Sequence, residues 1–547
     1  MVLDLFRFLL HEMPSWKAGI VGSSILSGLS RGLLLTIINA SAALAATGIF
    51  EPKYLAGFLA AMAVHLGANY YALSRARMLV ASMTRKLRMR ICGKILYTNL
   101  RYVENRGVGE IYSRLISDVH QLANSSLELL RAFEAAILLL FCLIYIGWLS
   151  LPGLAATVVT MIAGVSVYLL QEKKARNQLR LSRLKEAEFC NAVSDLLDGF
   201  KEVKVNRARQ TELSDYVDEV AVEFRDLNIS AELIVIRSLV TSQAFTFALI
   251  AGLVFLLPHL FATQSTVIFQ FLAAIFFMIG PLELLVSSVP AMSRARVALQ
   301  NVRLLEDDLD RAVSADENRA PRVEPMSFQD LRLDEVHFRF ESGESDDHFD
   351  LGPVSLELRR GEILFLVGGN GSGKTTLLKL LSGLYMPDAG RILVNGNGFE
   401  VSEYQAYREM FSTVFNDFHL FKRLYGIVMS DDDLLTKLLQ TLQLDGKTHY
   451  ENGRFTTIEL STGQRKRLAF AVACLEDRQI YVFDELAADQ DPGFRRFFYR
   501  ELLPELRRQG KTIVAATHDD RYFDAADRVI KLDYGRIVEQ EVHRATA

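Results

Sequence analysis

The sequence predicts an α-helical membrane domain followed by an α/β nucleotide-binding domain that is built around a phosphate-binding loop. Half of the 547 residues are apolar, and the mean hydropathy is +0.17, which is typical of membrane proteins. Near residue 300, long apolar runs with basic connections give way to short β-type runs, glycine turns and charged helices. We therefore expect a membrane domain over 1–305, an acidic linker over 306–326 and the second domain over 327–547.

Charge and cysteine content argue against several classes of function. The formal net charge is only −4, which gives no reason to expect a nucleic-acid partner. The four cysteines lie far apart and form no CxxC pair, so neither a disulfide framework nor a cysteine metal site is expected.

The first twenty residues, MVLDLFRFLLHEMPSWKAGI, have apolar positions at helical spacing and charged residues on the other faces. Acidic residues and the lack of a small-residue cleavage site argue against a cleavable signal. We expect a short helix that lies on the membrane surface before the first span.

Six runs approach the ~20 apolar residues that cross a bilayer. They are Lys17–Thr47, Lys53–Ser74, Ser126–Ser150, Gly153–Leu170, Leu233–Leu257 and Thr266–Val289. The connections Arg75–Arg114 and Lys173–Arg209 are long and basic, whereas the others are short and nearly uncharged. The positive-inside rule places the basic connections and both termini in the cytoplasm. Their helical pattern predicts extended helices that turn near Asn105–Gly109 and Gly199–Asn206.

Several ionisable residues fall inside or near these spans. They are Arg31, His65, Glu128, Arg131, Glu134, Arg237 and Glu283. Charges at membrane depth are costly and usually face a bundle interior or a watery cavity. Arg31, Arg131, Arg237 and Glu283 are therefore candidate cavity residues, and the arginines suit an anionic cargo. For Glu128 and Arg131, the i,i+3 spacing favours a structural ion pair.

The phosphate-binding loop follows a β-type run, EILFLV at 362–367, and precedes a helical run. It consists of Gly368, Gly369, Asn370, Gly371, Ser372, Gly373, Lys374, Thr375 and Thr376. This strand–loop–helix order is the context that the G-x-x-x-x-G-K-[ST] pattern requires. Its backbone N–H groups can surround the phosphates of ATP. Lys374 can reach the β- and γ-phosphates, and the Thr375 hydroxyl can bind Mg²⁺.

Two later strands end in further candidate residues. The run QIYVF at 479–483 precedes Asp484, which can hold the magnesium shell, and Glu485, which can polarise the attacking water. The run at 512–516 precedes Thr517 and His518, and a histidine there can contact the γ-phosphate.

Together these residues resemble the ATP-binding cassette (ABC) transporter family. LSTGQ at 460–464 is similar to the family signature, VFDE to its Walker B motif, AADQD to its D-loop and His518 to its switch histidine. Phe340 matches the aromatic residue that stacks on adenine. VENRGVGEIYSRLISDVHQL and LDGFKEVKVNRARQTEL resemble the cytoplasmic loops of the exporter class. The resemblance implies a six-span, type IV exporter fold followed by the ATP-binding domain.

The resemblance also explains why one chain has a single phosphate-binding loop and a single signature. In the family, the signature of one subunit completes the ATP site of the other in a head-to-tail dimer. Ser461, Thr462, Gly463 and Gln464 would then act in the partner's site, with Asp489 in the D-loop. A homodimer with two equal sites is the simplest assembly, and a heterodimer is the alternative.

One departure narrows the family. Asn416, in STVFNDFHLF, stands where the glutamine of the Q-loop is usual; asparagine keeps the amide but is one methylene shorter, and the resemblance implies that it contacts the ATP site. With the stretch AADQDPGFRRFFY, this segment resembles the bacterial cyclic-peptide and siderophore export branch, which includes pyoverdine- and syringomycin-associated exporters.

The resemblance implies ATP- and Mg²⁺-dependent export of a modified or cyclic peptide, such as a siderophore or its precursor, across the bacterial inner membrane. The alternatives are a siderophore importer with an exporter-type fold and a membrane ATPase that regulates a partner.

Overall fold

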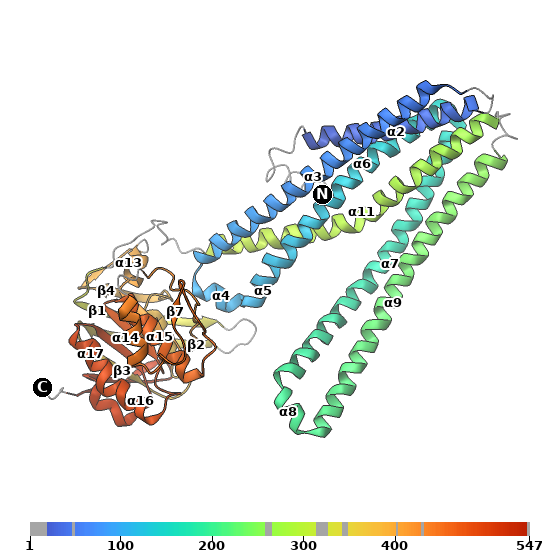
Figure 1. Ribbon diagram of the computed structural model, residues 1–547. Coiled ribbons are helices and arrows are strands. Elements are labelled where there is room, and N and C mark those ends of the chain that lie inside the picture. Colours follow the sequence, from blue (N-terminus) through green and yellow to red (C-terminus); the bar gives the residue numbers. More distant parts are fainter. Residues whose placement is uncertain are drawn as a thin grey trace. The chain divides into compact units, whose positions relative to one another are not determined.

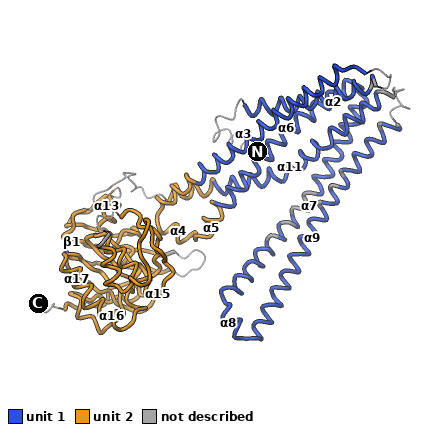
Figure 2. The backbone as a smooth tube through the Cα atoms, in the orientation of Figure 1, with its two compact units in different colours: residues 1–88, 116–302 blue, residues 89–115, 303–547 orange. Residues whose placement is uncertain are grey.

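A computed structural model describes residues 19–45, 50–256, 265–312, 326–341, 348–400, 403–427 and 432–543 (Figure 1). The chain divides into two compact units (Figure 2). The membrane unit consists of Met1–Arg88 and Ile116–Val302, and the nucleotide unit consists of Met89–Leu115 and Arg303–Ala547. The segment 89–115, which we expected in the membrane domain, therefore packs with the nucleotide-binding residues. The predicted surface helix at the N-terminus lies outside the described residues.

Long helices build the membrane unit. They are α2 (Gly19–Ala45), α3 (Pro52–Leu96), α6 (Val119–Leu149), α7 (Leu151–Asp198), α9 (Arg207–Ala251) with η3 (Gly252–Leu256), and α11 (Ser265–Ala312). Among the described residues, five segments are long and apolar enough to cross a membrane: Gly19–Ala42, Val108–Leu149, Leu151–Gln171, Arg207–Ala251 and Val267–Ala312. The sixth predicted span, Lys53–Ser74, lies in α3 and is not among them. His65, Asn69 and several tyrosines make this stretch less apolar than the others.

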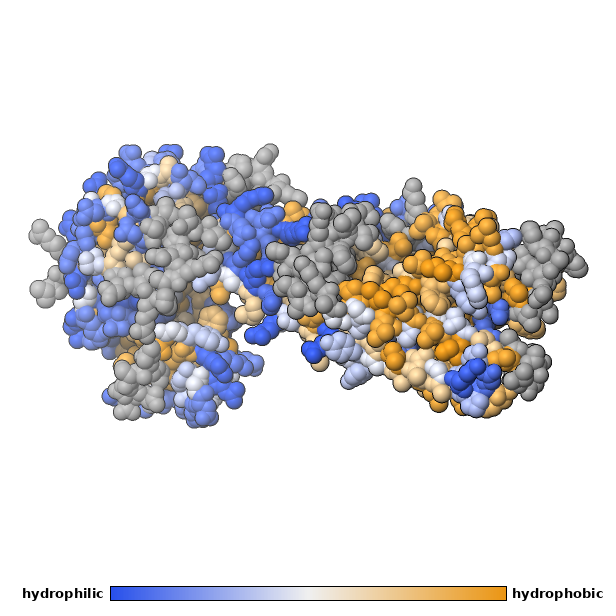
Figure 3. Space-filling view, turned by 90° about the horizontal axis from the view of Figure 1, so that it is seen from above, coloured by the Kyte–Doolittle hydropathy of each residue, from blue (hydrophilic) through white to orange (hydrophobic). Residues whose placement is uncertain are grey.

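Close helix contacts hold the membrane unit together. Gly28 and Gly32 on α2 face α6, and a Cβ at Gly32 would lie 2.4 Å from the Phe141 ring. Leu35, Leu138 and Phe271 belong to the buried cluster at this packing. Apolar side chains also cover much of the unit's outer surface (Figure 3). A surface of this kind suits lipid rather than water.

The helices turn where the sequence predicts. Gly107, with φ of 77°, separates α4 (Leu100–Arg106) from α5 (Val108–Ser113), and η2 (Arg114–Asp118) leads on into α6. The short helix α8 (Phe200–Val205) joins α7 to α9, which run side by side in Figures 1 and 2. Helix α11 continues beyond the membrane unit to Ala312, so residues 306–312 of the predicted linker are helical.

The nucleotide unit contains a six-stranded sheet in the order β12-β11-β3-β10-β9-β6. The strands are β3 (Ile363–Val367), β6 (Phe411–Val414), β9 (Ile480–Asp484), β10 (Thr512–Ala516), β11 (Arg528–Asp533) and β12 (Arg536–Val542). All are parallel except β12. The carboxyl ends of β3, β9 and β10 therefore meet at one edge, where ligands bind in sheets of this type.

Two smaller sheets accompany it. The first has the order β2-β1-β4-β5, with β1 (Asp330–Glu341), β2 (His348–Arg359), β4 (Ala389–Val394) and β5 (Asn397–Gly398); the second pairs β7 (Tyr450–Glu451) with β8 (Arg454–Phe455). The helical elements are α12 (Lys374–Leu381), α13 (Tyr404–Arg408), α14 (Asp432–Thr441), α15 (Thr462–Glu476), α16 (Pro492–Phe497), η5 (Phe498–Leu502), α17 (Leu503–Arg508) and η6 (Asp520–Ala525).

Other elements cover both faces of the six-stranded sheet. Because the side chains on both faces are therefore buried, the central strands are apolar along their whole length. Alternate residues of β3 enter different cores: Leu364 and Leu366 pack with the α12 side, whereas Ile363 and Phe365 pack with the α15 side. This period of two is the pattern of a strand that is buried on both faces. The buried sheet holds the loops at its edge in place.

Candidate nucleotide site

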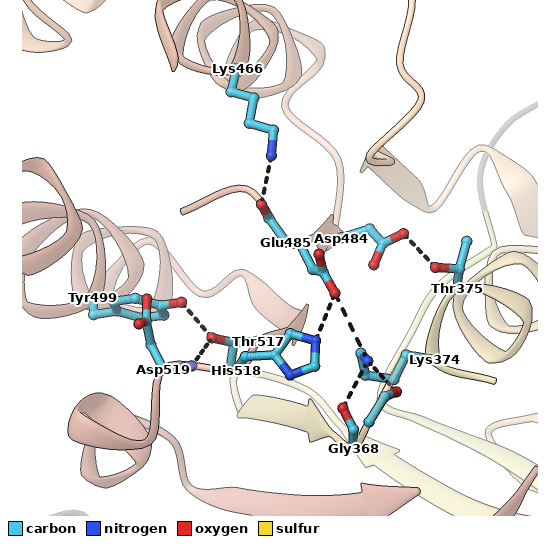
Figure 4. A network of polar contacts seen from close by, with 11 residues as sticks. Gly368, Lys374, Thr375, Lys466, Asp484, Glu485, Tyr499, Thr517, His518 and Asp519 are labelled. Carbon is cyan, nitrogen blue, oxygen red and sulfur yellow. Dashed lines mark hydrogen bonds and ion pairs between the residues drawn. The ribbon is translucent and has the colours of Figure 1, made fainter. Parts of the chain in front are cut away.

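The phosphate-binding loop joins β3 to α12 in a conformation that requires glycine. Gly368 has φ of 151°, and a Cβ there would lie 2.2 Å from the carbonyl oxygen of Leu532; Gly373 has φ of 100°. Lys374 begins α12 and is buried, with its Nζ donating to the carbonyl oxygens of Gly368 at 2.9 Å and Gly369 at 3.1 Å (Figure 4). The lysine therefore lies folded across its own loop.

Two features of this loop fit a phosphate ligand. Burial lowers the pKa of the Lys374 ammonium, while the carboxylates of Glu485 and Asp484 oppose that shift. Among the described residues, the buried Oγ of Ser372 has no hydrogen-bond partner. A phosphate oxygen would give the cation a counter-charge and the hydroxyl an acceptor, because buried polar groups are normally paired. Asn370, Gly371 and Thr375 are exposed, and Thr376 is half-buried.

The Thr375 hydroxyl donates to Asp484 Oδ2 at 2.8 Å. Asp484 ends β9 and is 2% exposed. Burial raises the pKa of its carboxyl, and the hydrogen bond from Thr375 opposes the increase. A hydroxyl and a carboxylate at this spacing are the oxygen ligands that Mg²⁺ prefers, so the pair fits the metal that the sequence predicts.

The three predicted catalytic residues lie together. Glu485 Oε1 is 2.9 Å from His518 Nε2 and 3.9 Å from Lys374 Nζ, and the three side chains point toward one another in Figure 4. Glu485 has φ of 51°, a left-handed conformation that costs a residue with a Cβ ~1–2 kcal/mol. Its backbone N–H donates to the Ala516 carbonyl at 3.1 Å, at the end of β10.

Sequence reasoning did not find the residues that anchor His518. The Tyr499 hydroxyl lies 2.6 Å from Thr517 Oγ1, and the Asp519 backbone N–H donates to that oxygen at 3.0 Å (Figure 4). Thr517 and Tyr499 are buried. These bonds fix the backbone on both sides of the histidine. In the sequence, Tyr499 stands in the apolar run FFY, and this pattern by itself indicates only a core residue.

The signature residues begin helix α15. Ser461 accepts a hydrogen bond from the Gln464 N–H at 3.4 Å, and Gln464 Oε1 accepts from the Ser461 N–H at 3.2 Å, which forms a capping box. Thr462 is exposed and Gly463 half-buried. A Cβ at Gly463 would lie 3.0 Å from the carbonyl oxygen of Asp489. The signature thus packs against the D-loop of its own chain.

Asn416 lies in a turn just after β6, with its side chain exposed. Its backbone amide hydrogen-bonds the Asp484 carboxyl and lowers that pKa. The main chain at the Q-loop position therefore reaches the metal-binding carboxylate, whereas the side chain makes no hydrogen bond within the described residues.

Two aromatic residues lie close to the loop. Phe340, the predicted adenine contact, is half-buried and is paired across the sheet with Phe349 of β2. A Cβ at Gly373 would lie 2.9 Å from the Phe349 ring. Phe349 therefore packs against the loop itself, a contact that the sequence analysis missed because no motif marks it.

The segment 89–115 contacts the helix that follows the phosphate-binding loop. Glu104 on α4 accepts from Lys379 Nζ at 2.7 Å and also from the Tyr385 hydroxyl. Arg101 forms an ion pair with Asp388 at 3.1 Å. Because Lys379 lies in the last turn of α12 and Lys374 begins it, one helix joins this contact to the phosphate-binding loop.

The predicted cavity residues are exposed and lie on four different helices: Arg31 on α2, Arg131 on α6, Arg237 on α9 and Glu283 on α11. Among the described residues, no hydrogen bond or ion pair joins any two of these four, so their place in a cavity stays a prediction. The structure corrects the pairing predicted for Glu128, which lies 3.9 Å from Arg294 of α11. The i,i+3 spacing with Arg131 made that residue the expected partner, but a helix distant in sequence supplies the cation.

A different polar cluster joins three helices of the membrane unit. Ser27 of α2 is fully buried, and its Oγ lies 2.5 Å from Glu134 Oε1 of α6 and 3.1 Å from His65 Nδ1 of α3. The sequence singled out His65 and Glu134 as ionisable residues near spans but gave no sign that a serine would link them.

Comparisons with known proteins agree with this architecture. The family described as "ABC transporter transmembrane region" matches residues 24–280, and the family described as "ABC transporter" matches residues 351–488. The chain is 37% identical over 466 residues to the ATP-binding protein SyrD of Pseudomonas syringae pv. syringae, covering 83% of this chain and 82% of that protein.

More distant relatives and a solved structure share the same plan. An ATP-dependent lipid A-core flippase of Paraburkholderia xenovorans (strain LB400) is 25% identical over 494 residues, with 85% of this chain and 80% of the flippase covered. The structure of a bacterial Atm1-family ABC exporter with ATP bound superposes with a TM-score of 0.76 at 19% identity, covering 96% of this chain and 95% of that one. This last similarity is one of fold.

Proposed function

This chain belongs to the ABC transporter family, and on that premise we propose that it exports a modified or cyclic peptide across the bacterial inner membrane. A siderophore or its precursor is the favoured cargo class. ATP hydrolysis by the second domain is coupled to transport in this family. The observation that carries the ATP-driven part is the convergence of Lys374, Glu485 and His518 at the mouth of the phosphate-binding loop (Figure 4).

ATP would bind with its phosphates in the loop. The N–H groups at the start of α12 surround the phosphate oxygens, and Lys374 exchanges its bonds to Gly368 and Gly369 for the β- and γ-phosphates. Phe340 would stack on the adenine. Bound Mg²⁺ would neutralise phosphate charge, and Thr375 and Asp484 are the residues that would hold it.

Hydrolysis would then use the two side chains opposite the lysine. Water attacks the γ-phosphorus, the bond to the β-phosphate oxygen breaks, and Glu485 accepts the proton that the water loses. His518 holds the Glu485 carboxylate at 2.9 Å and lies where it can also contact the γ-phosphate. Lys374 stabilises charge on the transferred group.

The complete site would need a second copy of the chain. One phosphate-binding loop and one signature are present in the sequence. Among the described residues, no hydrogen bond joins residues 461–464 to the loop at 368–376. A head-to-tail homodimer would supply the signature of one subunit to the loop of the other, and C2 symmetry would give two equal sites. A heterodimer with a related chain is the alternative.

The contact between Glu104 and Lys379 supports coupling between ATP and the membrane helices. A shift of α12 on nucleotide binding would move α4, because the ion pair at 2.7 Å and the hydrogen bond to Tyr385 join them. The basic character of the connections Arg75–Arg114 and Lys173–Arg209 would place both of them, and both termini, in the cytoplasm.

The cargo class follows from the branch that the sequence resembles. The stretch AADQDPGFRRFFY and the asparagine at the Q-loop position are features of that branch rather than of ABC proteins in general. The flippase relatives act on lipid A-core by name, but they match at 25% identity against 37% for SyrD.

Untargeted mass spectrometry of cells and medium tests the proposal. A strain with the Glu485→Gln variant is compared with the parent and with Glu501→Gln, a matched change of an exposed glutamate in η5. Export predicts a peptide metabolite that accumulates inside the Glu485→Gln cells and disappears from their medium.

Each other outcome contradicts the proposal in a distinct way. A metabolite left outside and missing inside indicates import. A changed lipid distribution with no peptide difference indicates a flippase. Unchanged metabolites, with ATP hydrolysis intact in the purified parent protein, indicate an ATPase that regulates a partner.

A further inference from the structure

Lys466 is a buried lysine whose role the catalytic residues do not explain. It lies on α15, two residues beyond the signature, and is 2% exposed. Its ammonium donates to the backbone carbonyl oxygen of Glu485 at 3.0 Å (Figure 4). The same ammonium lies 2.7 Å from Asp489 Oδ2. Burying a charge is costly unless it is paired. Both partners belong to the segment that follows β9.

The first contact fixes the backbone of the proposed catalytic base. Glu485 is held on both sides: its N–H donates to the Ala516 carbonyl at 3.1 Å, and its C=O accepts from Lys466. Its left-handed φ of 51° is unfavourable for a side chain with a Cβ, and such conformations persist only where surrounding contacts hold them. The same Glu485 carbonyl also accepts from the Ala488 N–H at 3.2 Å, so Lys466 supplies the side-chain contact among three hydrogen bonds that hold the Glu485 backbone.

The second contact joins the same lysine to the D-loop. The Asp489 side chain is about half exposed to solvent. Its carboxylate forms an ion pair with the buried Lys466 ammonium of α15. Next to this pair, Gln490 Nε2 donates to the Gly463 carbonyl at 2.8 Å, and Gly463 packs so closely on the D-loop that a Cβ there would lie 3.0 Å from the Asp489 carbonyl oxygen. The signature, the D-loop and the backbone of Glu485 thus form one connected group.

We infer that Lys466 is a positioning residue that ties the direction of Glu485 to the position of the signature helix. This inference deepens the proposed function and rests on its head-to-tail dimer, in which Ser461–Gln464 contact the partner's ATP. Nucleotide bound at one site would then set the catalytic base of the other through a single helix. The two sites would hydrolyse ATP cooperatively because of this lysine.

The test uses the full-length protein in lipid nanodiscs and compares Lys466→Met with Lys466→Arg. Methionine keeps the packing volume of lysine but removes its positive charge and its hydrogen-bond donors. Arginine keeps the charge and the donors. Lys511→Met is the matched control, because Lys511 pairs with Asp477 at 2.6 Å at the opposite end of α15. ATP hydrolysis is measured against ATP concentration, and ATP affinity is measured in the Glu485→Gln background.

We expect Lys466→Met to lower kcat on the order of 10- to 100-fold, the cost of misplacing a reacting group by about 1 Å. Its Hill coefficient should fall to that of independent sites, with ATP affinity within about twofold of the parent, since the loop itself is unchanged. Lys466→Arg should recover part of kcat and of the cooperativity. Lys511→Met should resemble the parent.

Asp489→Asn is a second route to the same contact and changes a partly exposed side chain. Its effect on the Hill coefficient should be non-additive with that of Lys466→Met, because both remove one interaction. By itself, Asp489→Asn should also lower the Hill coefficient toward that of independent sites, because it weakens the same ion pair; this readout remains if Lys466→Met fails to fold, and an unchanged Hill coefficient would overturn the coupling.

Three different results would contradict this inference. Unchanged kcat and Hill coefficient in a dimeric Lys466→Met protein would overturn the role of Lys466 alone. A parallel loss of thermal stability and ATP affinity, with the Hill coefficient retained, would show a purely structural lysine. A protein that is monomeric by light scattering with ATP bound would overturn the proposed dimer together with the coupling, whereas a wrong cargo would leave all these readouts intact.

Discussion

The nucleotide unit and the membrane unit assemble their polar residues in different ways. In the nucleotide unit, Lys374, Glu485 and His518 each follow a strand of one parallel sheet, and their side chains meet at its edge. In the membrane unit, the ionisable residues near the spans are spread over several helices; His65 and Glu134 meet through buried Ser27, and Glu128 pairs with Arg294 of another helix. A site built on strand ends can be inferred from motif order, whereas a site between helices depends on how those helices are rotated.

The largest effect should come from Glu485→Gln in the purified protein. ATP hydrolysis should fall on the order of 10²- to 10⁴-fold, because the amide cannot accept the proton from the attacking water. ATP binding should persist, since Lys374 and the loop are unchanged. Paired hydrolysis and equilibrium-binding assays, with Glu501→Gln alongside, check this. Hydrolysis at the parent rate would remove Glu485 as the base.

Thr375→Ala should have the next largest effect. The variant loses the hydroxyl that lies 2.8 Å from Asp484 Oδ2, so the Mg²⁺ concentration that half-saturates hydrolysis should rise about 10- to 100-fold. A Mg²⁺ titration at fixed ATP measures the shift, and chelation should abolish activity in the parent. An unchanged titration curve would mean that Thr375 is not a metal ligand.

A smaller effect, on stability rather than hydrolysis, is expected in the membrane unit. Ser27→Ala should destabilise the protein by about 1 kcal/mol, because it leaves the Glu134 carboxylate without its hydrogen bond between helices. Ser23→Ala is the control, since Ser23 bonds only within its own helix, to the Ile20 carbonyl at 3.0 Å. Thermal unfolding in detergent compares the two. Equal melting temperatures would show that the cluster contributes nothing to packing.

Cysteine labelling should distinguish the two units without altering activity. Burial raises the pKa of the Cys474 thiol, in the nucleotide unit, to about 12, and Cys190 on α7 is exposed. The thiolate is the reactive form. At pH 8, well below that pKa, iodoacetamide should modify Cys190 and spare Cys474 until the protein unfolds; peptide mass spectrometry checks this. Rapid modification of Cys474 in the folded protein would contradict its burial.

Much of the nucleotide site was predictable because its chemistry depends on local sequence. Gly368 and Gly373 have positive φ where the glycine pattern implies a tight loop, and Thr375 lies beside Asp484 as the magnesium interpretation requires. The anchors of that site were not predictable. Tyr499 is an aromatic residue in an apolar run, Phe349 is an aromatic residue in a strand, and Lys466 is a charged residue within a helix. Many unrelated proteins share these patterns.

Local sequence specified the two-part organisation, the apolar helices, the helix turns and the order of strands and loops that places Lys374, Glu485 and His518 at one sheet edge. It did so because hydropathy, glycine conformation and the parallel strand–loop–helix order act over short stretches of chain. Three-dimensional packing, by contrast, pairs Glu128 with Arg294, Glu104 with Lys379 and Lys466 with the Glu485 carbonyl. These contacts join residues that are distant in sequence, and helix rotation and packing, rather than any local pattern, bring them together.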